Sequence, residues 1–194
     1  MVDFQRSQKR KGLTYNVDLP GGAPKRLAEA ILYICGKCER DDAFGMVRLN
    51  KILFEADFLS FALRGRPITG VRYQRLRQGP APKAMLPKLR ELQADHLLAV
   101  QKTDFLGRPQ HRPIALRAAD LSVFSGEDIA ILDQMIEESW GKTAAEVSDA
   151  SHRIEWKTRT NGDPIPYEAA WLSNDPVTET DIDRTKELAA QYGW

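Results

Sequence analysis

The sequence predicts a mainly α fold with a small antiparallel β element, an α+β class, packed compactly around one central buried helix at about 47–63. Two observations predict this class. Apolar residues recur at helical spacing in most segments, whereas β-branched and aromatic residues bracketed by turn residues are confined to two short stretches, 68–76 and 97–118. The length of 194 residues is enough for one domain with a sizeable core plus extensions.

The chain divides into three predicted parts. Residues 1–24 show no sustained period and end in LPGGAP, which indicates a flexible N-terminal arm; a short strand at 13–17 is the alternative reading of part of it. Residues 25–175 form the main domain. Residues 176–194 form a C-terminal helix or tail.

The central helix carries two apolar stripes on different sides. The first stripe contains leucines and other aliphatic residues: Leu49, Ile52, Leu53, Ala56, Leu59 and Leu63. The second contains the aromatic residues Phe54, Phe58 and Phe61. At about 100° per residue, only the face around Lys51, Glu55 and Ala62 is left for water. We therefore expect a helix that is covered on two sides.

Asp57 projects between these two stripes, away from the face that we expect to be hydrated. A carboxylate in that position loses hydration and needs a partner. The residues that follow the helix, RGRPITG, offer backbone N–H groups and arginines. We expect Asp57 to anchor this loop; a catalytic role is the alternative.

The remaining elements follow from the same patterns. A helix starts near Pro24, and a strand follows Gly65 at 71–74, closed by QGPAP. Met85 opens a helix that runs to about 97. The segments 97–104 and 111–118 read as a hairpin that would pair with the strand at 71–74. Three further helices are predicted by their N-cap residues, Ser125, Thr143 and Thr178.

Composition excludes several classes of protein. The net charge of +1 argues against a dedicated nucleic-acid binder, and no apolar run approaches the roughly 20 residues that span a bilayer. The N-terminus has no apolar segment typical of a secretory signal. Two cysteines provide no disulfide framework. We therefore expect a cytoplasmic protein without a membrane partner.

Catalytic and metal motifs are weak. Cys35 and Cys38 form C-x-x-C, but they fall in an apolar-periodic helix without paired histidines, which favours buried thiols over a redox or zinc site. His152 follows Ser148 and Ser151, which suggests a hydrolase, but a triad is defined by geometry rather than local sequence. No phosphate-binding glycine loop is present. We predict no enzymatic activity, no metal and no cofactor.

Five arginines gather between residues 64 and 77 among glycines and prolines; they are Arg64, Arg66, Arg72, Arg75 and Arg77. Only one aromatic residue, Tyr73, accompanies them, and we expect it to face inward with Val71. Nucleic-acid binders usually interleave several aromatic side chains. Arginine is also enriched at protein–protein interfaces. We expect a partner protein surface first, a solvated face second and a nucleic-acid surface third.

The segment LNKILFEADFLSFALRGRPITGVRYQRLRQGPAP resembles the signature of the SocA-like antitoxin family, the Panacea domain, also known as phage-associated proteins. SHRIEWKTRTNGDPIPY resembles the family's C-terminal part. The sequence departs from the signature at Glu55, where an aromatic residue is more usual. The matching residues with an expected structural role are Lys51, Asp57, Gly65, Pro67, Thr69, Gly70, Tyr73, Gly79, Pro80, Pro82, His152 and Trp156.

The resemblance implies a mainly helical protein that neutralises a cognate toxin by direct contact. It also implies that such a protein can act as a proteolytic adaptor, delivering the toxin to the ClpXP protease. It implies no cofactor and no enzymatic activity. A DNA- or RNA-binding regulator that uses the residues from Arg64 to Arg77 is the alternative hypothesis.

Overall fold

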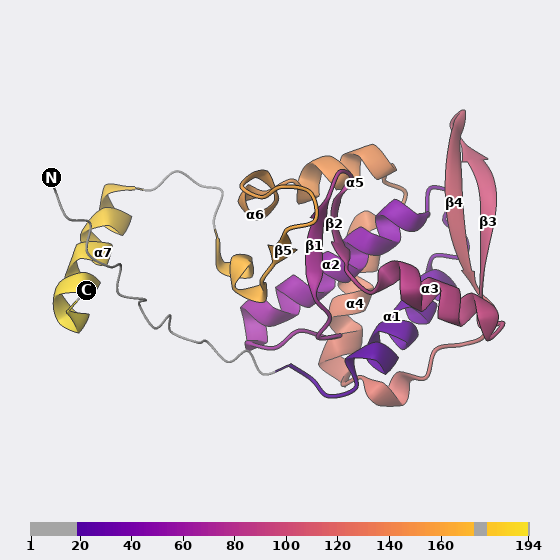
Figure 1. Ribbon diagram of the computed structural model, residues 1–194, viewed down its shortest axis with the longest axis horizontal. Coiled ribbons are helices and arrows are strands. Elements are labelled where there is room, and N and C mark those ends of the chain that lie inside the picture. Colours follow the sequence, from indigo (N-terminus) through magenta and orange to yellow (C-terminus); the bar gives the residue numbers. More distant parts are fainter. Residues whose placement is uncertain (1–18, 173–177, 194) are drawn as a thin grey trace, which may run out of the picture.

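The computed structural model describes residues 19–172 and 178–193, and it confirms the α+β prediction (Figure 1). Most of the expected N-terminal arm, including the strand considered at 13–17, lies outside these residues. The divisions proposed after residues 24 and 175 stay predictions. The helices are α1 Ala23–Lys37, α2 Met46–Arg64, α3 Met85–Ala94, α4 Gly126–Ser139, α5 Ala144–Ser151, α6 Ile154–Lys157 and α7 Glu179–Tyr192, with 3-10 turns at Leu121–Val123 (η1) and Tyr167–Trp171 (η2).

Helix α2 runs through the middle of the molecule, with α1, α4 and α5 around it (Figure 1). Both apolar stripes are covered, because Leu49, Ile52, Leu53, Phe54, Phe58 and Phe61 are all at most 5% exposed. Two expectations for this helix are wrong. Lys51, which we expected to face water, is 3% exposed, and Leu63, which we expected in a buried stripe, is 68% exposed.

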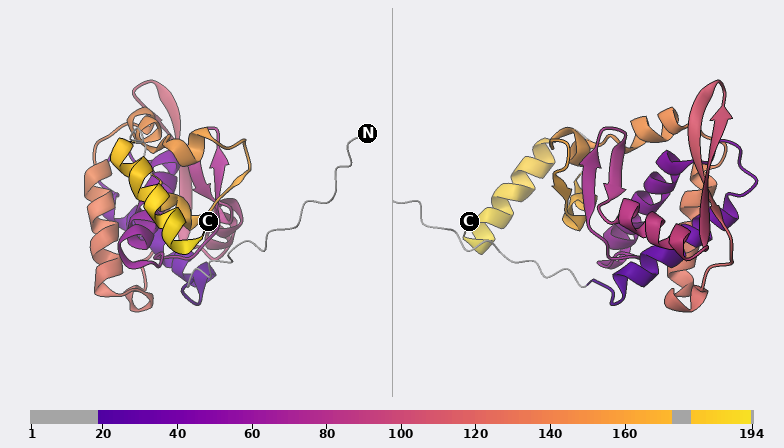
Figure 2. Two further views of the ribbon diagram at one scale, coloured as in Figure 1. Left: turned by 90° about the vertical axis from the view of Figure 1, so that its left-hand side faces the viewer. Right: turned by 45° about the vertical axis from the view of Figure 1, so that its right-hand side comes forward.

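The strands form two separate antiparallel sheets. Strands β1 Tyr73–Leu76, β2 Gly79–Pro82 and β5 Pro164–Ile165 make one sheet in the order β2-β1-β5, and β3 Leu98–Phe105 pairs only with β4 Arg108–Ala115. The expected pairing of the hairpin with the strand at 71–74 is therefore wrong. The hairpin stands instead at one side of the molecule (Figure 2).

The segment GPAP, which we expected to be a closing turn, is itself a strand. The register pairs Leu76 with Gly79 and Tyr73 with Pro82, so a two-residue turn at 77–78 reverses the chain. Prolines are tolerated at the edge of a sheet because no neighbouring strand needs their missing N–H group. Strand β2 occupies such an edge.

The predicted helix starts are confirmed. Ser125, Thr143 and Thr178 are N-caps, and each forms a capping box with the acidic residue three positions on. Helix α3 ends at Ala94, earlier than expected, since His96 adopts a left-handed conformation with φ 57° that a helix cannot continue through. No helix within residues 19–172 and 178–193 is long and apolar enough to cross a membrane.

Candidate functional site

Asp57 lies at the centre of a buried group of hydroxyl and backbone partners. Helix α2 places it at 1% exposure. Its carboxyl group accepts hydrogen bonds from the Thr69 N–H group, at 2.7 Å, and from the Thr69 hydroxyl. The hydroxyl oxygens of Tyr73 and Tyr167 lie 2.8 and 3.3 Å from its Oδ2 atom. The prediction that Asp57 anchors the following loop is confirmed.

The two tyrosine hydroxyls beside Asp57 each have two possible acceptors. Each tyrosine hydroxyl also lies near a backbone carbonyl: Tyr73 is 2.9 Å from Leu53 O, and Tyr167 is 2.6 Å from Val71 O. Since a hydroxyl donates only one hydrogen, each tyrosine donates either to Asp57 or to its carbonyl, and a proton on Asp57 would allow a further bond to only one of the two hydroxyls. Burial raises the pKa of Asp57, against the bonds from Thr69 and Tyr73 that lower it. This group is suited to bracing the structure.

The loop that Asp57 holds is shaped by two glycines in the left-handed region. Gly65, with φ 71°, ends α2 and donates its N–H group to Phe61 O at 2.8 Å. Gly70 has φ 74°, and a β-carbon there would lie 3.0 Å from a side-chain carbon of Pro20. Ser60 donates its hydroxyl to Arg66 O at 2.7 Å. The backbone from 65 to 70 is therefore fixed at several points.

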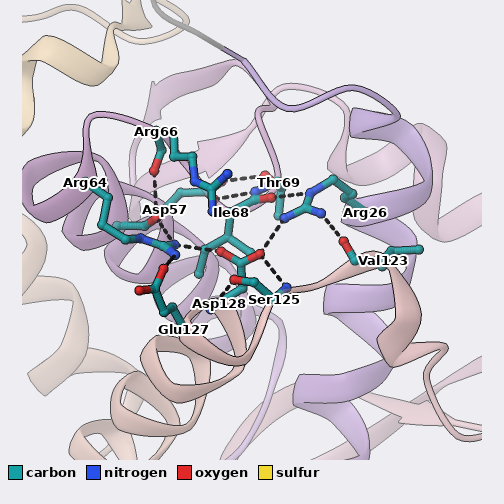
Figure 3. Close-up of polar contacts among 11 residues, drawn as sticks. Arg26, Asp57, Arg64, Arg66, Ile68, Thr69, Val123, Ser125, Glu127 and Asp128 are labelled. Carbon is teal, nitrogen blue, oxygen red and sulfur yellow. Dashed lines mark hydrogen bonds and ion pairs between the residues drawn. The ribbon is translucent and has the colours of Figure 1, made fainter.

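A second acid, Asp128 at the start of α4, holds the same loop from outside (Figure 3). Its carboxylate is paired with Arg26 at 2.8 Å and with Arg64 at 2.6 Å, and it accepts the Ser125 N–H group at 3.0 Å. Arg26 also donates to Ile68 O. Burial opposes ionisation of Asp128, but the bonds from Ser125, Arg64 and Arg26 together lower its pKa. Arg26 thus joins α1, the loop and α4.

Lys51, His152 and Trp156 meet where the turn between β1 and β2 contacts α5 and α6. The imidazole of His152 stacks on Trp156 with 3.7 Å between ring centroids, and the guanidinium of Arg75 lies 4.0 Å from the centre of the same indole. The Trp156 N–H group donates to Leu76 O at 2.9 Å.

Gly79 leaves the space that the Lys51 amine occupies. A β-carbon at Gly79 would lie 1.5 Å from Lys51 Nζ and 3.0 Å from Ser151 Oγ. Its φ of 104° is also one that other residues rarely adopt. The side chain of Lys51 therefore packs directly against the backbone of β2. We call the group formed by Lys51, Arg75, Gly79, Ser151 and His152 the turn corner.

The site residues expected from sequence fall within the part of the chain that a family model matches. The model is described as antitoxin SocA-like, Panacea domain, and it matches residues 49–157. The chain belongs to the SocA-like antitoxin family. Comparisons with curated proteins and with solved structures returned no match. The Asp57 group and the turn corner thus take their residues largely from the Panacea domain, with Tyr167 added from beyond the matched range.

The five arginines of this Panacea domain do not form one set. Arg64 is used within the fold through Asp128 and Glu127, and Arg75 lies over Trp156. Arg66, Arg72 and Arg77 are exposed, and none of the salt bridges found among residues 19–172 and 178–193 involves them. Tyr73 and Val71 are buried together, as expected.

The remaining candidates have structural contacts. Cys35 and Cys38 are buried free thiols, and burial raises the pKa of Cys38 to about 12. Ser148 donates its hydroxyl to Gln78 O at 3.1 Å, and Ser151 donates to Ser148 O at 2.9 Å. Both serines therefore hold the turn and the helix. Within the described residues no group of three or more metal-ligating side chains was found.

Sequence reasoning missed the burial of Lys51 and the role of Asp128. Ser125 and Asp128 have the spacing of an N-terminal capping box, which indicates a helix start. This pattern does not indicate that Asp128 pairs with Arg64 and Arg26, which lie 64 and 102 positions earlier in the chain. Lys51 forms an i,i+4 pair with Glu55, a pattern typical of an exposed face. The residues that cover it, Gly79 and Ser151, are distant in sequence.

The pH dependence of stability gives a prediction for Lys51. Burial lowers the pKa of Lys51 to about 7, with Glu55 opposing the shift. The unfolded chain then binds more protons between pH 7 and 10.5, so the destabilisation caused by burying Lys51 diminishes as pH rises through this range. We expect the unfolding free energy of the wild type, minus that of Lys51→Met, to grow by about 2 kcal/mol from pH 7 to 9.

Urea unfolding of both proteins at several pH values measures this difference. The comparison with Lys51→Met is needed because the buried thiols act in the opposite direction: their raised pKa values reduce stability as the unfolded cysteines ionise. The subtraction cancels that contribution. A difference that stays constant from pH 7 to 9 would mean that Lys51 titrates normally in the folded protein.

Proposed function

We propose that the protein neutralises a cognate toxin by direct binding. Membership of the SocA-like antitoxin family carries this proposal. The geometry supports it, because the segment 65–82 is held from within: Asp57 binds Thr69, and Arg26, which is paired with Asp128, donates to Ile68 O. The same segment turns Arg66, Arg72 and Arg77 outward. Fixed backbone with exposed arginines suits recognition of a protein, since little order must be gained on binding.

Co-expression tests the proposal. The product of the adjacent gene is expressed alone and together with this protein, and growth and co-purification are measured. We expect growth arrest by the toxin alone, rescue on co-expression and a stable complex. A neighbour that arrests growth but is neither rescued nor bound would contradict direct neutralisation.

Charge reversal locates the contact. We expect Arg66→Glu, Arg72→Glu and Arg77→Glu each to weaken toxin affinity by about tenfold, because each places a repelled charge at the interface. Arg90→Glu on α3, which is also an exposed arginine, is the matched control and should bind as the wild type does. Calorimetry measures each affinity. If all four variants bind the toxin with the affinity of the wild type, the interface lies elsewhere.

The same variants separate the alternative function, nucleic-acid binding by the exposed arginines. A nucleic-acid surface requires affinity that falls steeply with salt, by about one logarithmic unit per phosphate contact for each decade of salt. We expect no such binding to duplex DNA or single-stranded RNA at low salt. Salt-sensitive binding that is lost in Arg72→Glu and kept in Arg90→Glu would favour the alternative.

We propose further that the complex can deliver the toxin to the ClpXP protease, as the family resemblance implies. The half-life of the toxin should then shorten when this protein is present and lengthen again in cells that lack ClpX. If the half-life is the same with and without ClpX, neutralisation proceeds by binding alone.

A further inference from the structure

The turn corner concentrates buried polar atoms that lack hydrogen-bond partners. Seven such side-chain atoms were found across residues 19–172 and 178–193. Three of them, Lys51 Nζ, Arg75 Nε and His152 Nε2, belong to the turn corner, and Asn50 Oδ1 lies beside Lys51 in the chain. Buried polar groups are almost always bonded, so a local group of unpartnered ones indicates a place where a further molecule binds.

Lys51 is the strongest member of this group. Its side chain is almost fully buried, with Lys51 only 3% exposed, and its protonated amine has three hydrogens to donate. It is held against Gly79, close to Ser151 Oγ. Ser151 donates its own hydrogen to Ser148 O, so its oxygen can still accept. An ammonium group in this position requires an acceptor of negative charge.

The charges around the turn corner favour an anion. Arg75 on β1, Lys157 on α6 and Lys51 on α2 all act to lower the pKa of His152, whose burial has the same effect. Among the described residues, Asp149 on α5 acts on His152 and Glu55 on α2 acts on Lys51, and the hollow that Lys51 lines also contains Glu138 and Glu146. Glu55 is paired with Arg153 at 2.6 Å, which reduces its effect on Lys51. Positive charge is therefore in excess on the His152 side of the turn corner, where three cations and one acid act on the imidazole.

Two hollows adjoin the Lys51 amine. Lys51 contributes to the lining of a hollow of about 320 Å³, whose other charged residues are Lys142, Arg153, Glu55, Glu138 and Glu146. Gly79, which the amine contacts, lines another of about 520 Å³ together with Asn50. The contact between Lys51 and Gly79 thus joins two residues that line different hollows.

We propose that the turn corner binds an oxyanion, a carboxylate or a phosphate group, through the Lys51 ammonium and the His152 imidazole, with Arg75 at its edge. None of these three residues belongs to the proposed toxin contact, which consists of Arg66, Arg72 and Arg77. The ligand is defined by its chemistry: a compact anion with at least two oxygen acceptors. Chloride, which has no such oxygens to accept from both groups, should not replace it.

Thermal unfolding with acetate, inorganic phosphate and chloride at matched ionic strength tests the proposal at pH 6.5. We expect acetate or phosphate to raise the unfolding temperature of the wild type above its value in chloride, and Lys51→Met and His152→Gln to lose most of this increase. Lys102→Met, which removes an exposed amine on β3, is the matched control and should keep it. An increase with acetate alone identifies a carboxylate site, and one with phosphate alone identifies a phosphate site.

NMR titration of the wild type gives a second measurement that does not depend on a variant folding. The Lys51 Cε resonance should move as the anion is added, in the direction of the protonated amine, and saturate. The proposal is overturned if neither anion exceeds chloride, if Lys51→Met responds as the wild type does, or if the Lys51 resonance does not respond.

Discussion

Replacing Asp57 by alanine is expected to lower the free energy of unfolding by about 3–5 kcal/mol, since it leaves the buried Thr69 N–H and hydroxyl groups without a partner and opens a cavity. Asp57 is 1% exposed and lies within bonding distance of Thr69, Tyr73 and Tyr167. Urea unfolding at pH 7 measures the loss. A change below about 1 kcal/mol would be too small for a residue that braces the loop.

Asp57→Asn is the matched control. Its amide oxygen can still accept the Thr69 N–H group, and its NH₂ group has two hydrogens to donate to the tyrosine hydroxyls. We therefore expect less than half of the alanine effect. The raised pKa of Asp57 supports this expectation, because burial already favours the uncharged acid. If the asparagine variant is as unstable as the alanine variant, the negative charge itself is needed.

Asp128→Ala is the second large effect, with an expected loss of about 3 kcal/mol or more, because the change removes the acid that pairs with Arg26, which is 14% exposed, and leaves Arg64 only its pair with the exposed Glu127. It also removes half of the capping box with Ser125. Glu127→Ala removes the neighbouring ion pair with Arg64, in which the glutamate is 71% exposed, and should cost less than about 1 kcal/mol.

Lowering the pH should also distinguish the contribution of Asp128 to stability from that of Glu127. The pKa of Asp128 is lowered in the folded protein, so its contribution is present at neutral pH and is lost as pH falls below the ordinary carboxyl range. The stability difference between wild type and Asp128→Ala should therefore shrink on acidification. Equal stability of the two alanine variants at pH 7 would show that Asp128 does not connect α1, α2 and α4.

Much of the fold could be predicted because its signals are local. The two stripes of α2, the N-cap residues Ser125 and Thr143 and the hairpin of β3 and β4 depend on spacing over a few residues. Asp57 was predicted correctly for a related reason: a carboxyl group between two apolar stripes must be bonded, and its partner Thr69 lies only twelve positions further on.

The missed features depend on contacts between distant segments. Lys51 is covered by the turn before Gly79 and by α5, and neither cover is visible in the helix pattern. Strand β2 is rich in proline, which argues against a strand unless the edge position is known. The short strand β5 pairs two residues with β1 from about ninety positions away. The turn corner could therefore be recognised only from the structure.

Amide hydrogen exchange at Thr69 tests most directly whether Asp57 fixes the segment that follows α2. The Thr69 N–H group donates to a fully buried carboxyl group, so we expect it to exchange as slowly as the amides in the middle of α2. In Asp57→Ala, exchange of the Thr69 amide should accelerate more than exchange of the amides in the middle of α2. If Thr69 in the wild type exchanges as fast as the exposed turn at Leu106, Asp57 does not hold the loop.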